Sequence, residues 1–495
     1  MSLLCATISE STPESISKQI HLASQFADLL EFRLDKMFPH SKGSIESIDF
    51  NSLRKFRELA PIPVIINYPY RDYFHSLSDY ITLIKILALL RPEYLDIDIT
   101  VPEYPTSRIL RPYSKTKIIR STHLDHTDLS LVSLPDVYAS MKKHFSAYLY
   151  KIVVETDSTL DTLNLYSQSL TLGKDLIFLC SGIKGTASRI LSPVKENPIN
   201  YSHVTGYPPV AKGQLSTKEL LRYNYRFLNK HSSIFALVGD PVKNSIGHVI
   251  HNYFLSKKQI NSCYLKLNTP LENLEDTLQI IKTLPFKGLS VTAPLKSAIL
   301  PFVDFPSSFV KKVGAANTLV IKKGYVYAFN TDGVGCLRAL QRLNIPLKKV
   351  AILGFGGSGR AIALALALNG SKVSVYNRTT DKFSHLIKEH SIQIFSLKKL
   401  DSPETTYDLL ISTLPPKVAI NIPLKIARCF MDLSTLPKKT PHIISAQQQG
   451  IPVIHGYQMF VEQALDQIRL WFPNTLSLGF NRMLFKKTER TLFFT

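Results

Sequence analysis

Short apolar runs alternate with amphipathic stretches along the first half of the chain. The apolar runs span residues 3–8, 29–34, 64–67, 94–99, 117–122, 149–154, 176–180 and 203–207. Between them lie stretches with helical spacing of apolar residues, such as 13–26, 79–90 and 158–169. Repeated alternation of strand and helix predicts a parallel sheet, and about eight such units predict a closed (β/α)8 TIM barrel. We therefore predict an N-terminal barrel over residues 1–215.

Polar residues stand at the ends of these runs, where a barrel places its active site. They include Glu31, Arg33, Asp96, His123, Arg189 and Gln214. Lys151 differs because it lies inside the sixth run, in Leu-Tyr-Lys-Ile-Val-Val. Such a lysine commonly reaches outward to solvent, but burial would favour the neutral amine, which can attack a carbonyl. In a covered barrel strand we favour a Schiff-base lysine, with His123 as proton shuttle.

A different order of elements follows residue 232, after a polar, helix-capable connector at 216–232. An apolar strand at 350–353 leads into a glycine-rich turn, an Ala/Leu-rich helix and a second strand at 372–376. The turn contains Gly354, Gly356, Gly357, Ser358 and Gly359. Strand, turn, helix and strand in this order predict a Rossmann domain, whose helix N-terminus binds a pyrophosphate.

The residues after that second strand indicate which dinucleotide binds. An NAD site usually has an acidic residue there for the ribose hydroxyl. This chain has Asn377, Arg378 and Thr379 instead. A guanidinium and a hydroxyl suit a 2′-phosphate, so we predict NADP(H) as the cofactor. The alternative is an ordinary solvated strand end.

Composition and charge narrow the class of protein. The 495 residues predict two or three domains, and the net charge of +21 suggests anionic partners. We find no basic block, zinc spacing or other nucleic-acid signature, so small anionic substrates are preferred over nucleic acid, and no metal is predicted. Five scattered cysteines and the absence of a signal sequence or membrane span predict a soluble, cytoplasmic protein. The oligomeric state stays open.

The first half resembles type I 3-dehydroquinate dehydratase, a (β/α)8 enzyme with an imine-forming lysine. The matching motifs are Glu-Phe-Arg-Leu-Asp at 31–35, Ser-Thr-His at 121–123, Lys151, Gly182 to Ser188-Arg189, and Lys-Gly-Gln at 212–214. The resemblance implies that Lys151 forms the imine and His123 acts as acid and base. It further implies a substrate-binding set comprising Glu31, Arg33, Arg71, Arg189 and Gln214.

This half departs from the family pattern at two places. The family's Arg-x-x-x-Glu-Gly-Gly loop should follow residues 64–67, but the chain reads Tyr-Pro-Tyr-Arg-Asp-Tyr-Phe-His. Arg71 can replace the arginine, whereas the glutamate has no counterpart. A serine expected four residues before Gln214 is Val210.

The second half resembles shikimate dehydrogenase over residues 233–478. Matching motifs are Asp-Pro-Val-Lys-Asn-Ser at 240–245, Gly-Ala-Ala-Asn-Thr at 314–318, Asn-Thr-Asp-Gly at 330–333 and His-Gly-Tyr-Gln-Met at 455–459. Ser290-Val-Thr-Ala-Pro-Leu-Lys296 matches the family's Asn-Val-Thr-x-Pro-x-Lys, with serine in place of asparagine. Two further departures are Gly247 for the second serine of the opening motif and Thr435 for a tyrosine.

This resemblance implies roles and domain limits. Lys296 and Asp332 would be the catalytic pair. The substrate would be held by Ser245, Thr292, Asn317 and Gln463, and Gly456 would join the NADP site. The substrate domain would comprise residues 233–332 and 455–478, with an NADP-binding domain at 333–454 and a tail at 479–495.

The two resemblances name consecutive steps of one pathway, because the product of the first enzyme, 3-dehydroshikimate, is the substrate of the second. We therefore predict a fused bifunctional enzyme. One alternative keeps only the dehydrogenase and treats the barrel as a degraded scaffold, given the missing glutamate loop. Another treats the basic chain as an anion- or nucleic-acid-binding module.

Overall fold

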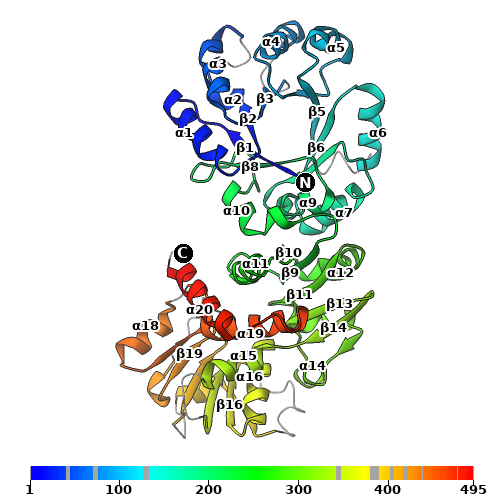
Figure 1. Ribbon diagram of the computed structural model, residues 1–495. Helices are drawn as coiled ribbons and strands as arrows, with labels where there is room; N and C mark the ends of the chain where they lie inside the picture. Colours follow the sequence, from blue (N-terminus) through cyan, green and yellow to red (C-terminus); the bar gives the residue numbers. More distant parts are fainter. Residues whose placement is uncertain are drawn as a thin grey trace. The chain divides into compact units, whose positions relative to one another are not determined.

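The computed structural model describes residues 2–40, 45–70, 76–125, 133–341, 347–379, 390–401, 406–415, 418, 422–437, 439–476 and 478–493. The chain divides into two compact units, shown in Figure 1. The first comprises Met1–Ser232 and Ile260–Cys263, and the second comprises Ser233–Gln259 and Tyr264–Thr495.

The first unit is an eight-stranded parallel barrel, as predicted. Its strands are β1 (Leu3–Ile8), β2 (Leu29–Arg33), β3 (Val64–Asn67), β4 (Tyr94–Asp98), β5 (Lys117–Leu124), β6 (Leu149–Glu155), β7 (Leu176–Ser181) and β8 (Ile199–His203). Their hydrogen-bonded order is β7-β6-β5-β4-β3-β2-β1-β8. The larger helices around it are α1 (Pro13–Ser24), α3 (Phe50–Leu59), α4 (Leu77–Leu89), α5 (Glu103–Leu110), α6 (Leu134–His144) and α7 (Thr159–Ser169). Shorter helices are α2 (Leu34–Met37), α8 (Thr186–Ile190), α9 (Ser192–Lys195) and α10 (Thr217–Arg222).

The eighth strand lies elsewhere than predicted. We predicted residues 203–207, whereas β8 spans Ile199–His203. The apolar pattern misses this strand because Asn200 and Ser202 are polar, yet both are fully buried. Their side chains donate to main-chain carbonyl oxygens at 2.8 and 3.0 Å. Buried polar groups are tolerated when they are hydrogen-bonded in this way, so a strand need not be an apolar run.

The barrel interior is built in layers because alternate residues of each strand point inward. A buried apolar cluster contains, among others, Leu29, Ile65, Tyr94, Ile119 and Leu149. Two residues further along the same five strands, the buried positions are polar: Glu31, Asn67, Asp96, Ser121 and Lys151. The apolar layer closes the base of the barrel, and the polar layer faces its C-terminal mouth.

The segment after β8 continues the barrel. Ser216 and Glu219 form a capping box at the start of α10, with Ser216 N donating to Glu219 Oε2 at 2.8 Å. Thr217 Oγ1 donates to the carbonyl oxygen of His203 at 3.2 Å and so ties the helix to the end of β8. The first compact unit accordingly extends to Ser232.

The second unit contains two six-stranded sheets. The first is mixed and ordered β10-β9-β11-β13-β14-β12. Its strands are β9 (Ser233–Gly239), β10 (Ser262–Asn268), β11 (Phe286–Val291), β12 (Phe305–Pro306), β13 (Thr318–Lys322) and β14 (Tyr325–Phe329). Its helices are α11 (Gly247–Lys257), α12 (Leu274–Thr283), α13 (Leu295–Ala298), α14 (Ser308–Val313) and α15 (Asp332–Gln341).

The second sheet is parallel and has the Rossmann strand order, which confirms that prediction. Its order is β17-β16-β15-β18-β19-β20. The strands are β15 (Lys349–Leu353), β16 (Lys372–Asn377), β17 (Ile392–Ser396), β18 (Leu409–Ser412), β19 (Phe430–Asp432) and β20 (Val453–His455). The helices include α16 (Gly357–Leu368), α18 (Pro441–Gln448) and α19 (Gly456–Trp471).

The C-terminal tail forms α20 (Leu478–Phe493), which packs on α11 and α19 (Figure 1). Phe480 lies edge-on to Phe254 of α11, with ring centres 5.5 Å apart. Tyr457 of α19 donates to Glu489 Oε1 at 3.2 Å. The tail therefore supports two helices of the second unit. Among the described residues, none of the helices combines the length and apolar character needed to cross a lipid bilayer.

Candidate functional sites

A cavity of about 290 Å³ lies at the carboxyl ends of the barrel strands. A cavity of this size with a polar lining fits a small polar metabolite. The predicted residues that line it are Glu31, Arg33, His123, Lys151, Arg189 and Gln214. Arg71 lies outside the described residues.

Lys151 remains inside the barrel, with 5% of its surface exposed. Its Nζ donates to Asp96 Oδ2 and lies 4.8 Å from the centre of the Tyr201 ring. Asp96 Oδ1 has no hydrogen-bond partner within the described part of the chain. Asp96 is therefore placed to take the proton that Lys151 must lose before it can act as a nucleophile.

His123 lies two residues beyond the level of Lys151, nearer the mouth of the barrel. Strands β5 and β6 pair Ser121 with Lys151 and His123 with Val153. The His123 side chain is exposed and lines the cavity. Desolvation by the surrounding protein, followed by the nearby charge of Lys151, lowers the pKa of His123. The neutral imidazole is thereby favoured, and it can accept a proton from a substrate.

Arg189 provides a buried cation for an anionic substrate. It is 3% exposed, and its Nη1 donates to the carbonyl oxygen of Tyr201 at 3.4 Å. Its Nε–H has no partner among the described residues. Burial lowers the pKa of Arg189 to about 10, which the negative charge of Glu31 opposes. The guanidinium thus stays charged at neutral pH and has donor capacity for a carboxylate.

Three polar side chains form a chain along one wall. Thr7 Oγ1 donates to Glu31 Oε2 at 2.7 Å and accepts from Gln214 Nε2 at 3.4 Å. Gln214 Oε1 accepts from the backbone N–H of Val210 at 3.1 Å. The main chain therefore contributes to this wall at the position where the family pattern has a serine.

Arg33 reaches the same cavity but is already paired. Its Nε and Nη2 donate to the two carboxylate oxygens of Asp35 at 2.8 and 2.9 Å. Sequence reasoning assigned no role to Asp96 or Tyr201, which surround Lys151. Asp96 was already placed at the active-site end of its strand, and the alternation of inward positions could have shown that it points into the barrel, because it stands two residues after Tyr94.

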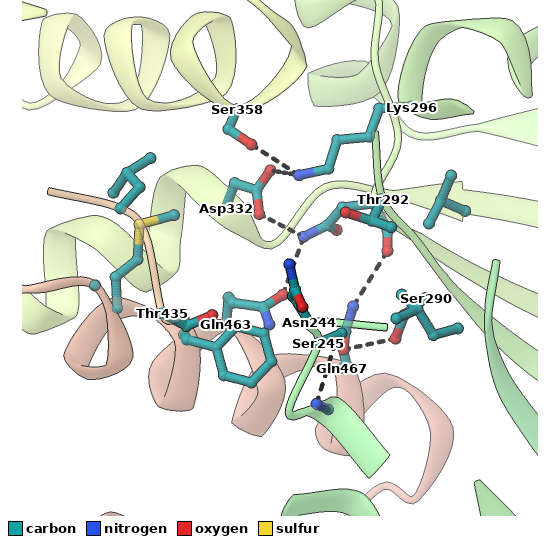
Figure 2. Close-up of a pocket in the computed structure, with 18 of the residues that line it drawn as sticks. Asn244, Ser245, Ser290, Thr292, Lys296, Asp332, Ser358, Thr435, Gln463 and Gln467 are labelled. Carbon is teal, nitrogen blue, oxygen red and sulfur yellow. Dashed lines mark hydrogen bonds and ion pairs between the residues drawn. The ribbon is translucent and has the colours of Figure 1, made fainter. Parts of the chain in front are cut away.

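A second cavity, of about 300 Å³, lies in the second unit. Figure 2 shows side chains entering it from the loops after β9 and β11, from the starts of α15 and α16, and from α19. All six residues predicted for catalysis or substrate binding line it: Ser245, Thr292, Lys296, Asn317, Asp332 and Gln463. Ser358 and Gly456, predicted for the cofactor, line the same cavity.

Lys296 lies between two oxygen acceptors (Figure 2). Its Nζ donates to Asp332 Oδ2 at 2.5 Å and to Ser358 Oγ at 2.8 Å. The Asp332 carboxylate is 5% exposed and also accepts from Asn317 Nδ2 at 2.8 Å. An ammonium held by a buried carboxylate can donate a proton to a developing alkoxide or stabilise it.

Both the oxygen and the nitrogen of the Asn317 side-chain amide are hydrogen-bonded to other residues of the protein. Its Oδ1 accepts from the backbone N–H of Thr331 at 2.8 Å and from Thr318 Oγ1 at 2.7 Å. Its Nδ2 donates to Asp332 and, at 3.2 Å, to Gln463 Oε1. In this structure Asn317 thus orients Asp332 and Gln463, and the amide nitrogen of Gln463 is left to donate to a ligand.

The turn between β15 and α16 fits a pyrophosphate. Gly354 has φ +92, a conformation that favours glycine. A Cβ added at Gly359 would lie 2.4 Å from the Gly354 carbonyl oxygen, so the helix and the turn approach too closely for a side chain. A Cβ added at Gly356, by contrast, would have no other atom within 4 Å. This open side lies at the N-terminus of α16, where free N–H groups favour anions.

The end of β16 lies next to this turn, because the strands pair Leu353 with Tyr376. Asn377 Oδ1 accepts from the backbone N–H of Phe355 in the turn at 3.3 Å. Arg378 and its neighbour Thr379 are exposed at the same edge. Their position and chemistry fit a phosphate on the ribose of the dinucleotide.

Sequence reasoning missed several buried residues of the second cavity. They are Gln467, His251 and Tyr264, together with Ser290, which was noted only as part of a motif. Gln467 could have been found, because it follows Gln463 by one helical turn on α19 and lies on the same face. His251 and Tyr264 stack with ring centres 4.3 Å apart and carry no signal in an apolar pattern.

Three family models match the chain. The model of type I 3-dehydroquinase matches residues 4–231. The model of the shikimate dehydrogenase substrate binding domain matches residues 237–319, and that of shikimate/quinate 5-dehydrogenase matches residues 338–423.

Curated relatives include proteins that match the whole chain. The shikimate biosynthesis protein AroDE of Chlamydia trachomatis serovar D is 37% identical over 492 residues, which cover 99% of this chain and 97% of that protein. The chloroplastic bifunctional 3-dehydroquinate dehydratase/shikimate dehydrogenase of Arabidopsis thaliana is 26% identical, covering 95% of this chain and 82% of that protein. The shikimate dehydrogenase (NADP(+)) of Ignicoccus hospitalis is 31% identical, covering 48% of this chain and 92% of that protein.

Proposed function

This chain belongs to the family of bifunctional enzymes that join a type I 3-dehydroquinate dehydratase to a shikimate dehydrogenase, and we propose that its two cavities hold the two active sites. The enzyme dehydrates 3-dehydroquinate to 3-dehydroshikimate and reduces 3-dehydroshikimate to shikimate with NADPH. The first reaction belongs to the barrel and the second to the second unit. The substrates are anionic, which suits a chain with a net charge of +21.

In the barrel, Lys151 attacks the ketone of 3-dehydroquinate and forms an imine with loss of water. Asp96 receives the proton that Lys151 gives up. The imine acidifies the adjacent C–H bond, and His123 removes that proton and helps the hydroxyl to leave as water. Hydrolysis of the product imine then releases 3-dehydroshikimate and restores the Lys151 amine. Arg189 binds the substrate carboxylate. Arg33, Glu31 and Gln214, together with Arg71, bind the remaining polar groups.

In the second unit, Lys296 donates a proton to the oxygen of the ketone as the ketone becomes an alcohol. Asp332 holds Lys296 in place through their ion pair. Ser245, Thr292 and Gln463 bind the carboxylate and hydroxyls of the substrate. Asn317 holds Asp332 and Gln463 in place by donating hydrogen bonds to both. We also propose a domain division at residues 333 and 454, with residues 216–232 serving the barrel.

The cofactor is NADP(H), in agreement with the name of the Ignicoccus hospitalis relative. When bound, it supplies the hydride for the reduction. Gly354, Gly356, Gly357 and Gly359 would receive its pyrophosphate. The end of β16, with Asn377, Arg378 and Thr379, would bind its 2′-phosphate. Ser358 and Gly456 lie where the turn meets the substrate cavity, so they would border the nicotinamide end.

We also propose a cytoplasmic location. All five cysteines are free and buried, which suits a reducing compartment. A degraded barrel gains no support from the site, since the described residues keep a buried lysine, a histidine and an arginine around one cavity.

One observation carries the dehydratase assignment: a buried lysine paired with a carboxylate, beside an accessible histidine of lowered pKa. Reduction with borohydride in the presence of 3-dehydroquinate should attach the substrate carbon skeleton covalently to Lys151, which mass spectrometry of peptides detects. Lys195→Ala is a suitable control, because Lys195 is another buried barrel lysine that donates to the Leu176 carbonyl oxygen. Trapping that persists in Lys151→Ala would contradict the imine assignment.

A further inference from the structure

Ser290 and Gln467 face each other in the second cavity (Figure 2). Ser290 lies at the end of β11, and Gln467 lies on α19. Both side chains are buried, and Ser290 Oγ lies 2.9 Å from Gln467 Oε1. The resemblance described above places an asparagine at position 290. This chain instead has the smaller serine hydroxyl on β11, and the amide group is supplied by Gln467 of α19.

The direction of the hydrogen bonds at Gln467 is fixed by its other partners. Gln467 Nε2 lies 3.1 Å from the carbonyl oxygen of Asn317, which can only accept. It also lies 3.1 Å from Thr318 Oγ1, whose proton is already given to Asn317 Oδ1 at 2.7 Å. Both contacts require the amide N–H groups, so the oxygen of Gln467 must point towards Ser290.

The orientation of Gln467 in turn fixes that of Ser290. Because Gln467 Oε1 can only accept, the Ser290 hydroxyl must donate its single proton to it. Once this proton is given to Gln467, Ser290 Oγ has only lone pairs left, and these can accept a hydrogen bond from a ligand in the cavity that Ser290 lines.

We propose that Gln467 is a positioning residue that holds Ser290 as a hydrogen-bond acceptor for a hydroxyl of the substrate. An asparagine at position 290 could donate or accept, whereas Ser290 held in this way can only accept from the ligand. A carboxylate, which also only accepts, is therefore disfavoured next to Ser290. The pair thus selects both the group that binds there and the orientation of a polyhydroxylated ring acid.

This inference rests on the proposed dehydrogenase function, so the test separates the two. Full-length wild type, Ser290→Ala, Gln467→Met and the double variant are titrated with shikimate by calorimetry. NADP+ binding and the unfolding midpoint of each variant report whether the fold is intact. Turnover of shikimate with NADP+ is measured separately, and its absence from wild type would contradict the proposed function without bearing on the binding titrations.

We expect each single substitution to weaken shikimate binding about three- to ten-fold, the effect of one neutral hydrogen bond. The double variant should be no weaker than Ser290→Ala, because Gln467 acts through Ser290. Full additivity of the two losses would overturn the proposal, since Gln467 would then act independently. Unchanged binding by Ser290→Ala would overturn it as well, as would a wild type that fails to bind shikimate.

A chemical version of the test uses the three monodeoxy analogues of shikimate as probes. Wild type should bind one analogue about three- to ten-fold more weakly than shikimate, and Ser290→Ala should have lost that particular discrimination. If Ser290→Ala discriminates among the three analogues as wild type does, no hydroxyl donates to Ser290. This readout does not depend on whether Gln467→Met folds.

Discussion

His123 shows how neighbouring groups adjust a single side chain. Desolvation and the charge of Lys151 both lower its pKa, whereas Asp96 raises it. Lys151→Met removes one lowering cause and leaves Asp96 without its partner, so the pKa of His123 should rise in an NMR titration. Lys142→Met is a matched control, because Lys142 is an exposed lysine bound to Asp175. An unchanged pKa in Lys151→Met would contradict the coupling.

The same lowered pKa has a consequence for activity. His123 must be neutral to accept a proton, and it stays neutral until the pH falls through its lowered pKa. The acidic limb of dehydratase kcat/KM should therefore lie below the ordinary histidine value of about 6.5. A limb at or above that value would assign the essential base to another group.

Arg378 is the residue that we expect to distinguish the two dinucleotides. Arg378→Ala should raise the KM for NADP+ roughly ten-fold, the effect of losing a charged but exposed hydrogen bond. The KM for NAD+ should change little, because NAD+ has no 2′-phosphate. Arg428, which is also exposed, provides the control Arg428→Ala. Equal effects on both cofactors would exclude a role in phosphate recognition.

At the scale of elements, α10 tests whether the segment after β8 is part of the barrel. Ser216→Ala removes the cap of α10 and should lower the free energy of unfolding of the first unit by about 1 kcal/mol. Glu219→Gln retains the capping-box pattern and should cost much less. Urea unfolding compares the two. Equal stability of wild type and Ser216→Ala would show that α10 is a loosely attached connector.

Helices and strands with a regular spacing of apolar residues were predictable from the sequence, and those without such spacing were not. The β15 turn and the inward position of Lys151 follow from local patterns that the structure retains. Strand β8 could not be placed, because its polar residues Asn200 and Ser202 are stabilised by hydrogen bonds to the carbonyl oxygens of Arg189 and Cys5, which no local pattern reveals. The helical spacing from Gln463 could have placed Gln467 on the face of α19 that lines the cavity, but not its pairing with Ser290 and Thr318, since β11 and β13 meet α19 only in the folded chain.

At the scale of the whole molecule, one chain carries two cavities in separate compact units. Lys151→Ala should abolish dehydration but leave shikimate oxidation unchanged. Asp332→Asn should lower kcat for shikimate oxidation about 100-fold or more and spare dehydration. Separate assays of each variant with each substrate check this. Loss of both activities in either variant would contradict independent sites.

The central claim, two consecutive reactions on one chain, is tested most directly by following NADPH absorbance after adding 3-dehydroquinate to the purified full-length protein. We predict that wild type oxidises NADPH from this substrate, and that Lys151→Ala does so only when 3-dehydroshikimate is supplied. A wild type that oxidises NADPH with 3-dehydroshikimate but not with 3-dehydroquinate would contradict the account, because the barrel would then be a scaffold.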